Sequence, residues 1–147
     1  MLRLFVDSNV LFSGLLFRGQ PHELLRAAVE GRFTAVVSET VLAEADRAVA
    51  AKFGCPRGSV PLALRLLGAE LVPDAEVADP ERSAIQVRDP SDVAIVAAAL
   101  AAGVDALVTG DKDILSAADL PVRVVTVRQA LTLIGQAAQT STNRHDL

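Results

Sequence analysis

Acidic residues that could bind a metal ion stand in four short stretches of the chain. These residues are Asp7 in LFVDSN, Glu44 in SETVLAE, Asp92 in RDPSD, and Asp111 and Asp113 in VTGDKD. Carboxylates that gather at one place repel each other unless a cation lies between them, and ligand sets made only of oxygen suit Mg²⁺ or Mn²⁺. If the fold brings these stretches together, the sequence predicts a divalent metal site and a metal-dependent phosphodiesterase.

Apolar runs alternate with helical stretches along the chain. Strands are predicted at residues 2–6, 33–37, 69–72, 104–109 and 121–126. Helices are predicted at residues 8–16, 21–30, 39–52, 60–67, 91–102, 112–118 and 127–135, and residues 73–80 are predicted to form a loop. This alternation is typical of an α/β protein with a parallel sheet covered on both faces. In such sheets, ligands bind beyond the carboxyl ends of the strands.

The predicted topology places the acids at that carboxyl rim. Asp7 directly follows the first strand, and Asp111 follows the strand at 104–109 by two residues. Asp92 lies in the first turn of the helix that feeds this strand, so the helix must run antiparallel to it and begin at the same rim. Glu44 lies about a turn and a half into its helix, which puts it roughly 8 Å down from the helix start. One rim is therefore expected to collect four carboxylates.

Each acid also has an ordinary structural explanation. Asp7 and Asp111 could cap helices, and Asp92 near a helix start would be favoured by the helix dipole. Glu44 could be a charge on a solvated helix face, while Asp113 could be a further ligand or a charge at a helix start. These explanations do not predict that the acids converge, so the joint metal site is the preferred interpretation.

Other polar residues near the acids have weaker claims. Thr109 could orient Asp111 through a hydrogen bond, and Lys112 could neutralise charge on a phosphate. Ser8 and Asn9 could bind phosphate or water, although a capping role explains them equally well. No spacing of His and Cys suggests zinc. The residues left outside the site are Asp89, which precedes a proline, His22 and His145.

Length and composition indicate one domain. The 147 residues are 51% hydrophobic, and the domain is expected to cover residues 1–135, followed by a polar tail at 136–147 that frays. A single cysteine, Cys55, excludes a disulfide within the chain and a thiolate metal cluster, which favours the cytoplasm. The longest apolar run, 93–104, is too short to span a membrane, and Asp7 interrupts the apolar start, so no signal peptide is expected.

The charge balance bears on nucleic-acid binding. The net charge of −4 at first argues against a nucleic-acid partner. Without the five candidate ligands, however, 13 acidic residues remain against 14 basic ones, and the basic residues are spread out rather than gathered in a tail. The chain has no Trp or Tyr and only five Phe, so a stacking platform for bases is not expected. A short contact with RNA that does not read sequence fits best.

Three stretches resemble the PIN-domain family: LFVDSNVLFSGLL, VVSETVLAE and DPSDVAIVAAALAAGVDALVTGDKDIL. The resemblance covers about residues 1–134 and is strongest to PIN proteins described as toxins of toxin–antitoxin systems, relatives of the VapC toxins. It implies a three-layer α/β/α fold with a parallel sheet of five strands in the order 3-2-1-4-5. It also implies RNA cleavage that depends on Mg²⁺ or Mn²⁺, with one or two ions.

The resemblance also assigns site residues and partners. By motif, the family's four acids fall on Asp7, Glu44, Asp92 and Asp111, and Asp113 matches a further acidic position that many members have. A homodimer and a small antitoxin protein that occludes the site are implied as well. The stretch 45–58 departs from the family because it is rich in Ala where many relatives are more basic.

The working hypothesis is a metal-dependent endoribonuclease, acting as the toxin of a toxin–antitoxin pair. One alternative is a PIN fold that binds RNA or a protein without catalysis. Another is a phosphoryl-transfer protein of the receiver or haloacid dehalogenase type. The second alternative ranks low because the first strand ends in Val-Asp-Ser-Asn and lacks an Asp-x-Asp pair.

Overall fold

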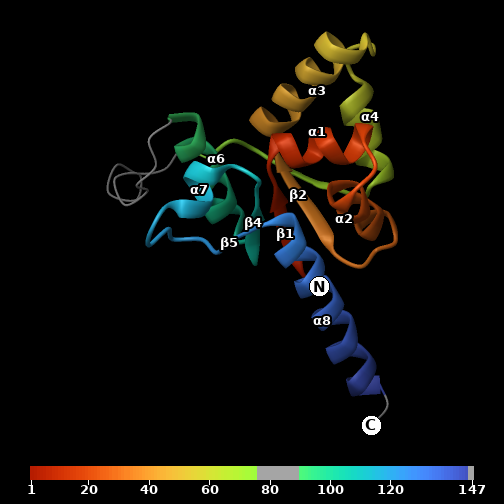
Figure 1. Cartoon of the computed structure of the whole chain (residues 1–147), viewed down its shortest axis with the longest axis vertical. Coiled ribbons are helices and arrows are strands. Elements are labelled where there is room, and N and C mark those ends of the chain that lie inside the picture. The colour runs from red at the N-terminus through yellow and green to blue at the C-terminus, as the bar shows by residue number, and fades with distance from the viewer. Residues whose placement is uncertain (76–89, 146–147) are drawn as a thin grey trace.

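The chain folds around a five-stranded parallel sheet, as the computed structural model in Figure 1 shows. The structure describes residues 1–75 and 90–145, with only the backbone described at 91 and 141–145. The strands are β1 (Arg3–Val6), β2 (Thr34–Ser38), β3 (Glu70–Val72), β4 (Ala106–Val108) and β5 (Val124–Val125). Their order is β3-β2-β1-β4-β5, with all neighbours parallel. The predicted order 3-2-1-4-5 is confirmed.

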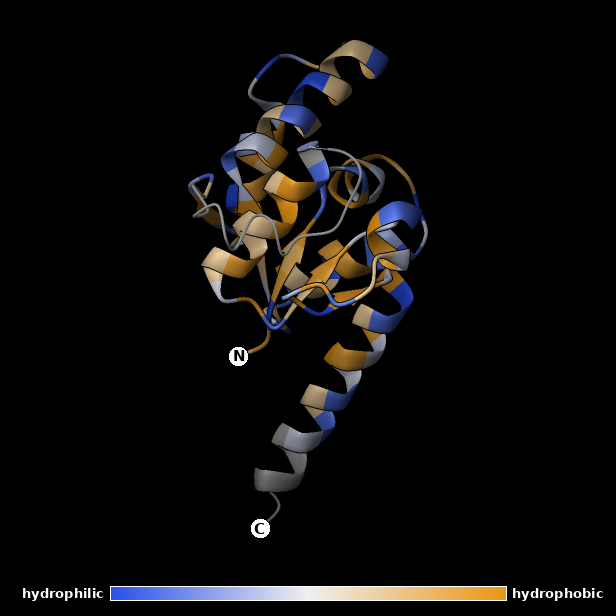
Figure 2. Ribbon diagram, turned by 90° about the vertical axis from the view of Figure 1, so that its left-hand side faces the viewer, coloured by the Kyte–Doolittle hydropathy of each residue, from blue (hydrophilic) through white to orange (hydrophobic). Residues whose placement is uncertain are grey.

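Helices flank this sheet and complete an α/β/α fold (Figures 1 and 2). They are α1 (Ser8–Leu16), α2 (Gln20–Val29), α3 (Glu39–Phe53), α4 (Ser59–Leu66), α6 (Pro90–Ala102), α7 (Lys112–Ser116) and α8 (Val127–His145). The predicted loop at 73–80 lies partly outside the described residues, and Asp89 lies wholly outside them. Among the described helices, none is long and apolar enough to cross a membrane.

The core lies along the three central strands, β2, β1 and β4, and the helices beside them. Phe5 of β1 pairs with Val36 of β2 and Leu107 of β4, and all three side chains are fully buried. Figure 2 shows the strands as an apolar centre between the helices. Helix α6 is apolar on nearly every face, and its residues Ile95–Ala99 are all buried, as expected of a helix without a polar face.

Helix α3 departs from the expected path. Instead of running back along the sheet, it rises from the end of β2 beyond the carboxyl rim, which faces the top of Figure 1. Its contacts are mainly with α1 and α4 rather than with the strands. Glu44 is therefore carried beyond the rim, and the expectation that it lies about 8 Å down from the helix start on the sheet side was wrong.

The last helix is longer than predicted. Gly135 was expected to end it, but α8 continues to His145 and projects from the body of the protein (Figures 1 and 2). Gly135 has no positive φ, in contrast to Gly54 and Gly103, which have φ of 64° and end α3 and α6. A glycine stops a helix readily when it adopts the left-handed conformation, and Gly135 does not.

Candidate metal-binding site

Asp7 is the buried centre of the candidate site. It follows β1 directly, caps the N-terminus of α1 and is only 3% exposed. Its Oδ1 accepts a hydrogen bond of 2.7 Å from the backbone N–H of Ser8. Its Oδ2 accepts one of 2.7 Å from the hydroxyl of Thr109. Because a carboxylate oxygen can accept more than one bond, both oxygens keep capacity for a further ligand.

Thr109 connects Asp7 to Asp111. The Thr109 side chain is fully buried at the end of β4, and its hydroxyl oxygen accepts a bond of 3.0 Å from the backbone N–H of Asp111. The carboxylate of Asp111 caps α7 by accepting a bond of 2.8 Å from the N–H of Asp113. The predicted role of Thr109 as an orienting residue thus holds for the backbone of Asp111.

Sequence reasoning missed the stronger bond between Thr109 and Asp7. The signal lies in the strand register: Val6 pairs with Val108, so the next residues of the two strands are neighbours. The backbone N–H of Asp7 donates to the carbonyl of Val108 at 3.1 Å and continues that pairing. The family resemblance implied that these strands are neighbours, but the register between them could not be read from the local sequence.

The other three acids reach the rim to different degrees. Asp92 is 7% exposed in the first turn of α6, and this turn lies at the carboxyl rim as predicted. Glu44 is half-buried on α3. Asp113 is exposed in the first turn of α7. Among the hydrogen bonds of the described residues, none joins Glu44 to another of the acids.

Asp7 and Asp111 do cap helices, as the ordinary structural explanation predicted. Capping alone does not say what balances their negative charge. The ion pairs within residues 1–75 and 90–145 are Arg3–Glu70, Arg26–Glu30 and Arg57–Asp46, and none of them involves Asp7. A buried carboxylate is costly unless its charge is compensated. Asp7 has hydrogen-bond donors but no basic partner in the described part of the chain, so a cation would complete its surroundings.

Within the described ranges, no group of three or more His, Cys, Asp or Glu side chains is arranged to hold a metal ion. The donor chemistry still fits, because Mg²⁺ commonly uses one or two carboxylates and fills its other positions with water and substrate phosphate. Asp7 with Asp111 or Asp92 could supply such a set of oxygens.

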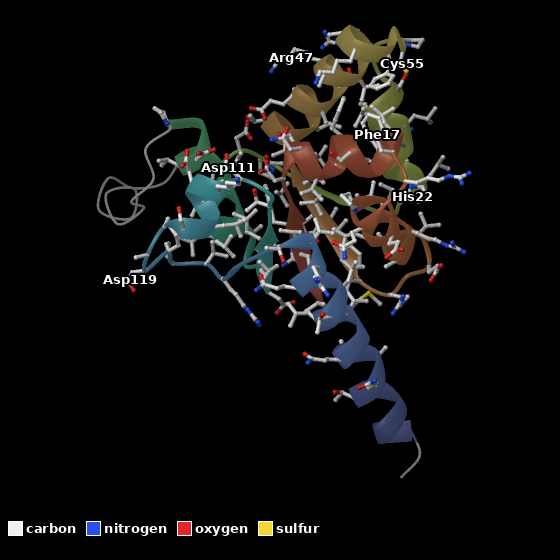
Figure 3. All side chains as sticks on the ribbon, viewed as in Figure 1. Phe17, His22, Arg47, Cys55, Asp111 and Asp119 are labelled. Carbon is white, nitrogen blue, oxygen red and sulfur yellow. The ribbon has the colours of Figure 1, made fainter. Side chains whose placement is uncertain are left out.

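The histidine that the structure describes fully lies away from this site. Figure 3 shows His22 and Asp111 on opposite sides of the molecule. The Nδ1 of His22 lies 3.0 Å from the carbonyl oxygen of Gly14, so the ring ties α2 to α1. His22 therefore has a structural explanation, in agreement with its exclusion from the site.

A family model for the PIN domain matches residues 3–113. The chain belongs to the PIN-domain family. This match includes all five predicted acidic positions. No protein with a curated function matches the chain in sequence.

Solved structures agree on the fold. VapBC2 from Rickettsia felis, bound to a DNA fragment from its promoter, superposes with a TM-score of 0.60 at 14% identity, over 85% of this chain and 98% of that chain. PAE2754 from Pyrobaculum aerophilum gives a TM-score of 0.59 at 18% identity, covering 92% and 96%. FitAB bound to an IR36 DNA fragment gives 0.60 at 20% identity, covering 84% and 94%. At these identities the likeness establishes a shared fold.

Proposed function

We propose that this PIN-domain protein is an endoribonuclease that depends on Mg²⁺ or Mn²⁺. The observation that carries the proposal is the surroundings of Asp7. This carboxylate is buried at the carboxyl rim, joined through Thr109 to Asp111, and not balanced by a basic side chain in the described part of the chain. Membership of the PIN family supports hydrolysis of nucleic acid as the reaction class.

The protein's own residues would bind and orient the reactants. Asp7 is the proposed central ligand, and Asp92 and Asp111 complete the set. A bound divalent ion would supply a water molecule of lowered pKa as the nucleophile. Glu44 would bind metal or hold that water, and Asp113 would be a further ligand. The proposed site holds one or two divalent ions.

Residues around the acids have supporting roles. The hydroxyl of Thr109 and the N–H of Ser8 each hold one oxygen of Asp7, which fixes the plane of the carboxylate. The N-terminus of α1 carries a partial positive charge that favours an anion there. Lys112 is exposed beside Asp111 and would neutralise charge on the scissile phosphate.

The cellular role proposed is that of a toxin in a toxin–antitoxin pair. The resemblance of the motifs to toxin components supports it, as does the shared fold with VapBC2 and FitAB, two protein complexes that were solved with DNA. A homodimer and a small antitoxin are proposed partners. Light scattering on the purified chain tests the first, and a monomer at micromolar concentration contradicts it.

The catalytic proposal is tested by replacing Asp7. Asp7→Asn keeps the size and the helix-capping ability of the side chain but removes the charge. Cleavage of a fluorescent single-stranded RNA in Mn²⁺ should fall at least about 100-fold, while the far-ultraviolet circular dichroism stays unchanged.

The matched control for this test is Asp119→Asn. Asp119 is exposed in the loop after α7 and has a φ of 55°, a conformation that Asn adopts readily (Figure 3). This control should cleave RNA at the parent rate. If Asp7→Asn also cuts RNA as fast as the parent, the assignment of Asp7 is wrong.

One observation favours a second candidate function. The described residues gather no trio of acids for metal, which suits a PIN fold that binds RNA or a protein without cutting it. Calorimetric titration with Mn²⁺ separates the two. Heat of binding at a single class of site that disappears in Asp7→Asn supports the nuclease, and no binding by the parent supports the non-catalytic module.

A further inference from the structure

Three of the five phenylalanines meet on the surface where α1 and α3 end. The ring centroids of Phe12, Phe17 and Phe53 are separated by 6.2, 6.0 and 5.8 Å for the pairs 12–17, 12–53 and 17–53. Phe17 is 52% exposed and Phe53 is 48% exposed. An aromatic cluster that served only to pack two helices together would bury these rings more completely.

Two basic residues, Lys52 and Arg18, lie beside this aromatic cluster. The Nζ of Lys52 lies 5.2 Å from the centroid of the Phe12 ring, within the range of a cation–π contact. Arg18 directly follows Phe17 and is exposed. From residue 47 to residue 58 the chain has three basic residues, Arg47, Lys52 and Arg57, and no acidic one. Arg57 does not add to the positive charge of this stretch, because it is paired with Asp46 at 3.0 Å. The cluster is thus positively charged in a chain whose net charge is −4.

The position of the cluster relative to the acids follows from the two helices. Both begin at the carboxyl rim, α1 at its cap Asp7 and α3 at its cap Ser38, on the neighbouring strands β1 and β2. The nine residues of α1 span about 14 Å. Stacked bases of one strand are about 3.4 Å apart, so roughly four nucleotides would reach from Asp7 to Phe17.

We propose that Phe17 and Phe53, with Arg18 and Lys52, form a stacking surface for single-stranded RNA that leads to the acidic site. This inference rests on the proposed function and names how the substrate is held. Aromatic faces with neighbouring cations are the common means of binding single strands without reading sequence. The half-exposed rings accept bases, and the basic side chains contact phosphates. The charge favours RNA over an apolar segment of a protein as the occupant.

The same residues explain how an acidic protein could hold RNA. The sequence predicted no stacking platform, because the phenylalanines are few and far apart in the chain. Phe12 and Phe17 lie in α1 and at its end, whereas Phe53 is 36 residues beyond Phe17 by number. Only the packing of α1 against α3 brings the three rings together.

The test is RNA binding in EDTA, where no metal-dependent cleavage occurs. Fluorescence anisotropy would measure the affinity of the full chain for a fluorescein-labelled 12-nucleotide oligouridylate and for an abasic strand of equal length. The double variant Phe17→Leu/Phe53→Leu keeps apolar packing but lacks ring faces. It should bind the oligouridylate at least about 5-fold more weakly and the abasic strand as well as the parent does.

A second variant tests the charge. Lys52→Gln should weaken binding to both strands and lower the dependence of log affinity on log salt by about 0.7. The matched controls are Val29→Ala, an exposed apolar residue at the end of α2, and Arg32→Gln, an exposed residue before β2 at the opposite edge of the sheet. Both controls should bind like the parent. Equal thermal midpoints would show that the variants are folded.

The outcomes separate this inference from the proposed function. If the parent binds and cleaves RNA but the Phe double variant binds oligouridylate as tightly as the parent, the stacking surface is wrong and the nuclease stands. If the Phe double variant instead changes the oligomeric state in light scattering, the cluster is an interface between copies and the inference is overturned. If the parent binds neither strand at any salt concentration, the stacking surface is wrong. The proposed metal site at Asp7 is then tested separately by Mn²⁺ binding.

Discussion

Hydrogen bonds at single residues define the proposed site more sharply than the acids alone. The hydroxyl of Thr109 serves two partners at once, the carboxylate of Asp7 and the backbone N–H of Asp111. Asp7 is buried and Asp111 is half-buried. The geometry of the site therefore depends on a residue that carries no charge and binds no metal.

Replacing Thr109 tests this positioning role. Thr109→Val has nearly the same shape but leaves two buried polar groups without a partner, so it should lower the free energy of unfolding by about 1–3 kcal/mol. Metal-dependent cleavage should fall roughly 10-fold or more. Thr109→Ser keeps the hydroxyl and should restore most of the cleavage rate. A Thr109→Val protein with parental Mn²⁺ affinity and cleavage would contradict the role.

Asp46 links α3 to α4 through its carboxylate. It accepts bonds from the N–H of Gly58 at 3.1 Å and from the guanidinium of Arg57 at 3.0 Å. The Gly58 N–H is the main cause that lowers the pKa of Asp46; burial acts against it, and Arg57 adds to the lowering. Because the folded pKa lies below the unfolded one, the stabilisation is complete above about pH 4 and is lost as the pH falls through the folded value.

The pH dependence of unfolding checks this account of Asp46. At pH 7, Asp46→Asn should be less stable than the parent in urea, because it loses the charged acceptor. The difference between the two proteins should shrink as the pH is lowered from about 4 toward 2. A difference that stays constant from pH 7 to pH 2 would show that the ionised carboxylate does not contribute.

At the scale of elements, the close contact between α1 and α2 depends on one glycine. A Cβ atom at Gly14 would lie 2.6 Å from the Cδ1 of Leu25 and 2.7 Å from the backbone oxygen of Pro21. Gly135 in α8 offers a matched comparison, since nothing lies within 4 Å of its added Cβ. The two positions are helical, and neither has a positive φ.

Two alanine substitutions separate packing from helix propensity. Gly14→Ala should lower the free energy of unfolding by about 1–3 kcal/mol, because the two helices must move apart. Gly135→Ala should raise it by roughly 0.5–1 kcal/mol, because alanine favours the helix. Thermal or urea unfolding of both variants measures this. If the two substitutions shift stability in the same direction, the crowding at Gly14 is not the controlling factor.

The helices that could be predicted are those whose ends are marked by capping residues in the sequence. Ser38 caps α3 by accepting a bond from the N–H of Val41, next to the predicted helix start at residue 39, and α1 has the predicted bounds 8–16. The direction of α3 could not be predicted, because it depends on packing against α1 and α4. This packing leaves no local pattern in the sequence of α3. The end of α8 was missed because the polar residues after Gly135 were predicted to fray, whereas the helix continues through them to His145.

At the scale of the whole molecule, the topology places Asp7, Asp92 and Asp111 at one rim of the sheet. This position follows from the carboxyl ends of β1 and β4 and from the direction of α6, which the sequence pattern predicted, while the strand order was implied by the family resemblance. The relative placement of the carboxylate oxygens depends on side-chain geometry that no sequence pattern describes. The aromatic cluster is a second product of the topology, since it joins the ends of two helices that start at neighbouring strands.

The charge distribution has the same origin. Asp7, Asp92 and Asp111 lie at the carboxyl rim, while Arg18 and Lys52 lie beside the aromatic cluster at the ends of α1 and α3. One molecule thus offers a region suited to a cation beside one suited to a polyanion. This separation, rather than the net charge of −4, is what matters for RNA binding.

Metal-dependent thermal stability tests the central claim most directly. At a Mn²⁺ concentration of about 100 Kd, binding to the folded state should stabilise the parent by about 2.7 kcal/mol, which raises the melting temperature by roughly 5–10 °C. Asp7→Asn should melt in EDTA at or above the parent temperature, since its buried charge is gone, and should not respond to Mn²⁺. If the parent does not respond to Mn²⁺, or if Asp7→Asn responds as the parent does, then Asp7 is not the centre of a metal site.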